Sequence, residues 1–220
     1  MLSRLLAVGA VTVVIVAMLS WYVTGFLMQS SPAVVVPTRA GATPVADMTL
    51  QTVASLGSGY SQPTWVSYLI KDRTGTWRHA TIFTLPAHAL VHVTVYQFDS
   101  ATGLRNAFLA RPEGVVGNVI GIDGKIVSVI DPSLTSHTFV VSALHLVVPL
   151  PGVADNAKNT CSQAPCSLAL AHRTITFSFR TGAPGRFRWQ CFVPCAAGFI
   201  YGLGGPMQTI GYMDGFLNVV

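Results

Sequence analysis

The sequence predicts an all-β domain, a sandwich of two sheets, preceded by one apolar N-terminal helix. Three observations predict it. Residues 5–28 carry no charge and are almost wholly apolar. Valine alternates with other residues in the segment Leu-Val-His-Val-Thr-Val-Tyr at 90–96, which places Val91, Val93 and Val95 on one buried face of a strand. From residue 65 onward, short β-type segments are separated by glycine, proline and aspartate, with no amphipathic helical pattern between them.

The N-terminal apolar segment is long enough for a transmembrane helix, which needs about 20 residues. Arg4 precedes the segment, as expected on the cytoplasmic side, and Trp21 and Tyr22 near its far end suit the membrane interface. A cleaved signal peptide is the alternative, because it would also begin with a basic residue and an apolar run. We expect residues 1–28 to be a single-pass anchor in the cell membrane, with the remainder on the extracytoplasmic side.

Residues 29–63 are rich in serine, proline, alanine, threonine and glycine, which predicts a linker. The folded domain is then expected over residues 64–220. Asp123-Gly124, flanked by β-branched residues, predicts a hairpin within residues 115–130. The other expected strands are 66–70, 81–85, 90–96, 138–141, 146–150, 174–179, 187–191 and 215–220.

Composition argues against two classes of function. The net charge of +5 comes from scattered residues, and the longest basic cluster is Arg186-Phe-Arg188, so nucleic-acid binding is not expected. The chain has a single glutamate, Glu113, and no Gly-x-Ser-x-Gly or His-Glu-x-x-His motif, which argues against a hydrolase.

The four cysteines form two close pairs. Cys161 and Cys166 flank a short loop that contains Pro165. Disulfides persist outside the cytoplasm, so export of this domain predicts a local disulfide between these two residues. The pair formed by Cys191 and Cys195 belongs to a different pattern.

Three segments carry residues suited to metal binding. In residues 131–141, His137 opens a strand directly after a turn. In residues 184–195, a Pro-Gly turn leads into an aromatic strand that ends at Cys191, and Cys195 follows four residues later. In residues 211–220, Met213 stands just before the terminal strand.

The order of these segments resembles the cupredoxin family, which includes azurin, plastocyanin and the exported domain of cytochrome c oxidase subunit II. The resemblance covers residues 65–220, with residues 103–130 as an insertion, and is most specific over 187–220. There Cys191-x-x-Pro194 and Met213-x-Gly215 are similar to the azurin ligand loop. The spacing Cys191-x-x-x-Cys195 instead resembles the dinuclear copper loop of the oxidase subunit.

The resemblance implies a cupredoxin-like Greek-key β-sandwich that binds copper. It implies His137 as the imidazole ligand, Cys191 and Cys195 as thiolate ligands, and Met213 as an axial thioether. Soft sulfur ligands combined with imidazole suit copper in electron-transfer sites. The implied function is electron transfer outside the cytoplasmic membrane, with a redox partner or respiratory complex, in an electron carrier or oxidase-subunit-like protein rather than a stand-alone catalyst.

The chain departs from the family pattern at the second histidine. No histidine follows Cys195, and Ala196 and Phe199 stand where the two ligand patterns have one. The four named ligands could still bind copper, with Met207 as a substitute. A disulfide between Cys191 and Cys195 would instead leave a copper-free structural or interaction subunit. Copper delivery is a third function, and another histidine could complete the site, the candidates being His88, His92 and His145.

Overall fold

The computed structural model describes residues 2–24, 31–54, 65–195 and 205–220. The chain divides into two units, residues 1–30 and 31–220. The first unit holds one helix, α1 (Leu2–Tyr22). Among the described residues no helix is long and apolar enough to cross a membrane. The predicted span over residues 5–28, of which 25–28 lie outside the described part, therefore gains no support from the structure.

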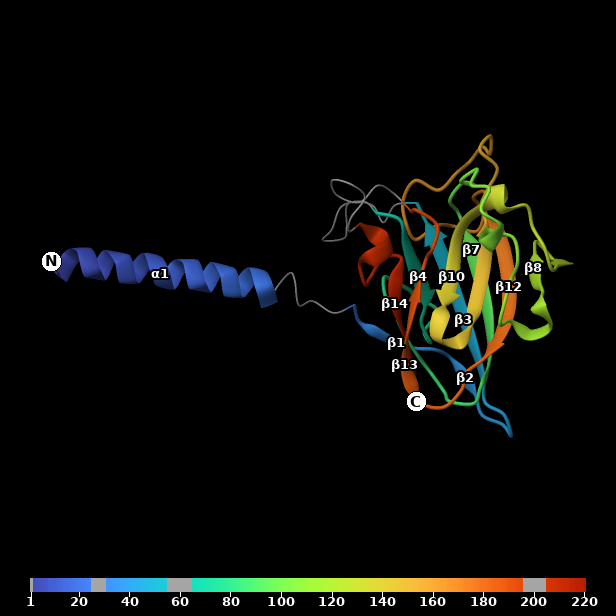
Figure 1. Ribbon diagram of the computed structural model, residues 1–220, viewed down its shortest axis with the longest axis horizontal. Coiled ribbons are helices and arrows are strands. Elements are labelled where there is room, and N and C mark those ends of the chain that lie inside the picture. The colour runs from blue at the N-terminus through green and yellow to red at the C-terminus, as the bar shows by residue number, and fades with distance from the viewer. Residues whose placement is uncertain (1, 25–30, 55–64, 196–204) are drawn as a thin grey trace. The chain divides into compact units, whose positions relative to one another are not determined.

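The second unit is an all-β sandwich of two sheets, as the sequence predicts (Figure 1). The first sheet has the order β1 (Ala33–Val35), β6 (Ile82–Leu85), β14 (Asp214–Val219), β13 (Gly185–Gln190), β10 (Thr135–Val141), β11 (Leu146–Pro151). The second has the order β5 (Trp77–Arg78), β4 (Ser67–Lys71), β3 (Val45–Val53), β7 (Leu90–Gln97), β12 (Arg173–Arg180), β8 (Ile120–Ile122), β9 (Lys125–Val127), with β2 (Thr38–Arg39) beside β3. The described 3₁₀ helices are η2 (Ala107–Leu109), η3 (Val116–Asn118), η4 (Pro132–Leu134), η5 (Ser142–Leu144) and η7 (Pro206–Gln208).

The linker expected over residues 29–63 is wrong for residues 31–54, which form β1, β2 and β3. Strand β3 lies inside the second sheet, between β4 and β7, and is parallel to β7. Its inward side chains Ala46, Met48 and Leu50 are fully buried. They alternate with polar residues, so the strand pattern is present, but the surrounding small and polar residues gave the segment the composition of a linker. The folded unit therefore begins near residue 31 instead of residue 64.

The core between the sheets is built around Trp189 of β13, which is fully buried. Its ring stacks on Phe139 and packs edge-on against Tyr68, at centroid distances of 5.1 and 4.9 Å. Such aromatic pairs contribute about 0.5–1.5 kcal/mol beyond the area they bury. The indole Nε1–H donates to the Thr81 carbonyl at 2.9 Å, so the buried polar atom is satisfied. Trp189 therefore joins β13 to both sheets, since Phe139 lies on β10 and Tyr68 on β4.

The predicted hairpin is confirmed as β8 and β9. Asp123 and Gly124 form its two-residue turn and both have positive φ, 50° and 81°. Positive φ at both central positions is the type I′ geometry that Asp-Gly favours. The Asp123 carboxylate also accepts the Thr174 N–H and pairs with Arg173, which ties the hairpin to the start of β12.

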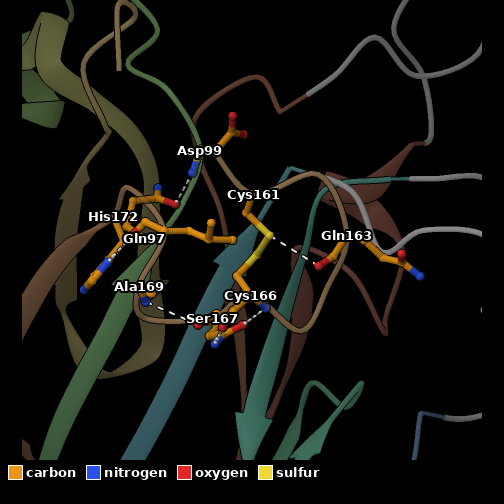
Figure 2. The surroundings of a disulfide bond; sticks show 10 residues. Gln97, Asp99, Cys161, Gln163, Cys166, Ser167, Ala169 and His172 are labelled. Carbon is orange, nitrogen blue, oxygen red and sulfur yellow. Dashed lines mark hydrogen bonds between the residues drawn. A yellow bond between two sulfur atoms is a disulfide. The ribbon is translucent and has the colours of Figure 1, made fainter. Parts of the chain in front are cut away.

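The predicted disulfide between Cys161 and Cys166 is confirmed, with a Cα–Cα distance of 5.8 Å. Its loop is docked on the second sheet by Gln51, a buried residue of β3. The Gln51 side chain accepts from the Cys166 N–H at 2.9 Å and donates to the Cys166 carbonyl at 2.8 Å. Figure 2 shows Gln97, the last residue of β7, and Asp99 in the surroundings of this disulfide.

Candidate metal centre

Pairing in the first sheet brings the three predicted segments to one end of the sandwich. Gln190, the last residue of β13, pairs with Asp214, the first residue of β14. Cys191 and Met213 therefore adjoin each other, and the Cys191 N–H donates to the Met213 carbonyl at 2.9 Å. His137 lies on β10, the other neighbour of β13.

A bulge in β10 adjoins His137. The register between β10 and β11 shifts between Thr135 and His137, so that Ser136 is an extra residue. Bulges bend a strand and re-aim its side chains, and they are frequent next to functional sites. Every residue of β10 is buried, and the His137 side chain is only 3% exposed. The bulge thus helps to direct a buried imidazole toward the end of β13.

His137, Cys191 and Cys195 form a compact buried cluster. Their ligand atoms all lie within 4.8 Å of one another. The His137 Nδ1 atom is 3.0 Å from the Cys195 sulfur and 3.8 Å from the Cys191 sulfur. The two sulfurs are 2.9 Å apart, and both cysteines are free. A disulfide would need about 2.05 Å, so the two sulfurs are not bonded to each other.

The donor set fits a soft metal ion. Metal bonds of about 2.0–2.3 Å place ligand atoms roughly 3–4 Å apart. Both distances from the His137 nitrogen to sulfur fall in this range, and the sulfur–sulfur distance of 2.9 Å lies just below it. If the two sulfurs moved slightly further apart, the three ligand atoms would therefore be spaced to bind one ion. Two sulfurs with one imidazole favour copper over the hard cations, which prefer oxygen.

The cluster also favours ionisation of one thiol. Burial raises the pKa of Cys191, but hydrogen bonds from Cys195 and His137 and the positive charge of His137 outweigh burial and lower it well below the usual range. The pKa of Cys195 is raised, because its thiol donates a hydrogen bond to Cys191 and is itself buried. Cys191 is therefore the thiolate of the pair.

The Cys191 sulfur receives further hydrogen bonds from β10. The Thr138 N–H donates to this sulfur at 3.4 Å, and the Thr138 hydroxyl lies 3.9 Å from it. The same hydroxyl accepts the Phe192 N–H at 2.8 Å, which ties the backbone after Cys191 to β10. Backbone donors stabilise an anionic sulfur, since the thiolate gains charge-assisted hydrogen bonds.

Asp99 is part of this site, although no pattern in the sequence singled it out. Its Oδ2 atom is 3.0 Å from the Nε2 atom of His137. Burial lowers the pKa of His137, but the hydrogen bonds to Asp99 and Cys191 and the negative charges of both groups raise it to about 9. The sequence signal was slight: Asp99 is one of seven aspartates and stands two residues beyond the valine-rich strand β7.

Met213 is fully buried and belongs to the same core cluster as the two cysteines. Met207, the expected substitute, is partly buried and packs against that cluster. Gly215 has a clear structural role, because a Cβ atom there would lie 1.8 Å from the Thr81 carbonyl oxygen. Met213-x-Gly215 is thus a segment that must pass close to another backbone. Ligation of a metal by Met213 stays a prediction.

The histidines considered as additional ligands lie elsewhere. His88, His92 and His145 are exposed, and none of them joins the metal-binding group found among the described residues. His92 pairs with the Ser178 hydroxyl at 2.8 Å on the second sheet. The positions of Ala196 and Phe199 lie outside the described residues.

Comparison with solved structures finds low-identity alignments, among them several to rusticyanin. No protein-family model matches it, and no curated protein sequence is similar to it. Rusticyanin from Thiobacillus ferrooxidans aligns at 15% identity and a TM-score of 0.33, over 83% of this chain and 84% of that one. A rusticyanin variant aligns at 15% identity and a TM-score of 0.36, over 87% and 85% of the two chains.

A multicopper oxidase also aligns, at 11% identity and a TM-score of 0.30, over 83% of this chain but 45% of the oxidase. Within the chain itself, the described strands carry the site residues in the order that the predicted cupredoxin-like sandwich implies. His137 lies on β10, Cys191 follows the penultimate strand and Met213 precedes the last strand. The finer resemblance to azurin, plastocyanin and oxidase subunit II stays a prediction.

Proposed function

We propose that this chain binds copper through His137, Cys191 and Cys195 and serves in electron transfer. The observation that carries the proposal is the compact buried cluster of one imidazole and two free thiols. A copper ion there would supply a one-electron couple. The protein's own residues supply the ligand atoms, exclude water by burial and hold the sulfurs with hydrogen bonds from Thr138. We include Met213 as the fourth ligand, because its segment adjoins Cys191.

Rigid ligands favour electron transfer, because a site that keeps one geometry in both redox states needs little reorganisation. His137 and Cys191 are held by neighbouring strands β10 and β13. A contact surface for a redox partner is offered by Phe192, the residue after Cys191. Phe192 is 44% exposed, and its ring stacks on that of Phe108 at 5.9 Å.

The compartment is part of the proposal. The Cys161–Cys166 disulfide supports an extracytoplasmic location, where disulfides persist. Attachment to the cell membrane through residues 1–28, and a respiratory complex as the partner, stay predictions. Fractionation of cells into cytoplasmic, membrane and external fractions tests the location, and recovery of the chain in the cytoplasm would contradict it.

Metal analysis of the purified full chain tests the binding itself. The reduced protein is loaded with copper anaerobically, freed of excess metal and assayed for copper per chain. We expect one copper ion in the parent and a large loss in His137→Ala. His92→Ala is the control, because it removes an exposed histidine that hydrogen-bonds to Ser178 and lies outside the cluster. Equal copper in the two variants would contradict the proposed site.

A copper-free structural or interaction subunit is the second candidate function. The observation that favours it is the sulfur–sulfur distance of 2.9 Å, which is short for two ligands of one ion. In that case Cys191 and Cys195 would be isolated as a disulfide, and the intact mass of the native protein would be lower by two further hydrogens. A native protein with two reactive thiols instead supports the copper site.

A further inference from the structure

Asp99 is held in one orientation by its neighbours. Its two carboxylate oxygens have separate partners: Oδ1 accepts the Ser100 N–H at 2.8 Å, and Oδ2 lies 3.0 Å from His137 Nε2. The Asp99 N–H donates to the Gln97 side chain at 3.1 Å, as Figure 2 shows, and its carbonyl accepts the Val153 N–H at 2.9 Å. Both the backbone and the side chain of Asp99 are therefore constrained.

The segment after Asp99 is fixed as well. Thr102 donates to the Thr135 carbonyl through its N–H at 3.3 Å and its hydroxyl at 2.7 Å, at the start of the strand that carries His137. Gly152 lies against the same segment, since a Cβ atom there would be 2.4 Å from the Ala101 nitrogen. Asp99 thus reaches His137 from the end of β7, in the opposite sheet, on a backbone with little room to move.

The two ring nitrogens of His137 face different groups. Nδ1 faces the sulfurs, 3.0 Å from Cys195, while Nε2 faces the Asp99 carboxylate. An ionised carboxylate can only accept a hydrogen bond. In the neutral ring this carboxylate favours the proton on Nε2, which leaves the lone pair on Nδ1, the atom beside the two sulfurs.

We propose that Asp99 is a positioning residue of the copper site, which holds the Nε2–H of His137 and so presents Nδ1 as the ligand nitrogen. This inference rests on the proposed function. Partners of this kind fix the tautomer and the orientation of a ligand imidazole, and their loss lowers metal affinity about 10- to 100-fold. The carboxylate also adds a negative charge beside the site, at the ring edge opposite the sulfurs.

Asp99→Asn tests the inference, because asparagine has the same shape but a single acceptor oxygen. The Ser100 N–H needs that oxygen, so the new amide NH₂ faces His137 Nε2 and requires a lone pair there. The variant should therefore move the proton of the neutral ring to Nδ1. Nitrogen-15 NMR of the reduced, metal-free full chain, at a pH above the His137 pKa, distinguishes the two tautomers without any copper.

Asp47→Asn is the matched control, since Asp47 also has one cationic partner, Arg39, at 3.0 Å. Parent and control should show the proton on Nε2, and Asp99→Asn should show it on Nδ1. Asp99→Leu, which has neither donor nor acceptor, should show a mixture of tautomers. Copper(I) affinity should fall about 10- to 100-fold in Asp99→Asn and stay at the parent value in the control.

The outcomes separate this inference from the proposed function. If the parent binds no copper, the proposed function fails, and the NMR tautomer still decides whether Asp99 sets the proton on His137. If Asp99→Asn keeps the proton on Nε2, the inference is overturned. A second result would also overturn it: Asp99→Asn moves the proton to Nδ1, the parent binds copper, and the two proteins have the same copper affinity.

Discussion

Replacement of Gly215 by alanine should destabilise the sandwich strongly. Gly215 stands two residues after Met213, at the place where β14 passes the start of β6. A Cβ atom there would lie 1.8 Å from the Thr81 carbonyl oxygen, so the backbone at Gly215 or at Thr81 must shift. This oxygen also accepts the Trp189 Nε1–H at 2.9 Å and the Phe216 N–H at 3.0 Å.

The magnitude follows from two effects of that shift. Overpacking in a well-packed interior costs about 1–3 kcal/mol. A buried donor left without its acceptor, such as the Trp189 indole, costs about 1–3 kcal/mol more. Gly215→Ala should therefore lower the free energy of unfolding by about 2–6 kcal/mol. For a domain of this size, about 4 kcal/mol corresponds to a fall in melting temperature of roughly 8–16 °C.

Urea denaturation followed by Trp fluorescence measures the effect, with Gly182→Ala as the control. Within the described part of the chain, no atom beyond Gly182 and its two neighbours lies within 4 Å of the site of a Cβ there, and its φ is not in the left-handed region. Gly182→Ala should be neutral or stabilising by about 0.4–1 kcal/mol, because alanine restricts the unfolded chain. If Gly215→Ala is as stable as Gly182→Ala, the close contact between β14 and Thr81 is refuted.

Three further predictions concern the cysteines and His137. Oxidation of the metal-free protein with diamide should join Cys191 to Cys195, whose sulfurs are 2.9 Å apart. The oxidised protein should bind no copper until a reductant is added. Copper binding by the oxidised protein would contradict a site that contains both sulfurs. Copper affinity should rise about a hundredfold per pH unit between roughly pH 7 and 9, because copper must displace one proton from His137, whose pKa is raised to about 9, and one from the Cys195 thiol, whose pKa is also raised. Affinity that does not change with pH would contradict ligation by these two groups. The double variant Cys161→Ser/Cys166→Ser should lose about 2 kcal/mol of stability, as expected for a short closed loop, while its copper content stays at the parent level.

The parts of the fold found from sequence are those with a local signal. Alternating valines in β7 and the Asp123-Gly124 turn act over a few residues, and the structure has both the buried face and the type I′ turn. Strand β3 has a similar alternation, but its neighbours along the chain are small and polar. Its place inside the sheet depends on parallel pairing with β7, more than 40 residues away, and no local signal encodes that pairing.

The candidate site was found because its residues stand at strand ends in a recognisable order. His137, Cys191 and Cys195 converge in the structure as that order implies. Asp99 could not be found in this way, because it joins the site from the other sheet, 38 residues before His137, through a side-chain hydrogen bond. Sequence spacing also could not decide between a disulfide and two free thiols at Cys191 and Cys195.

The central claim, a copper ion bound by the Cys191 thiolate, is tested most directly by absorption spectroscopy of the copper-loaded full chain. The parent should show an intense visible band from charge transfer between sulfur and copper, at one copper per chain. Cys191→Ser should lose this band and most of its copper. A parent without the band, or a Cys191→Ser variant that binds copper with the parent's affinity and spectrum, would contradict the account.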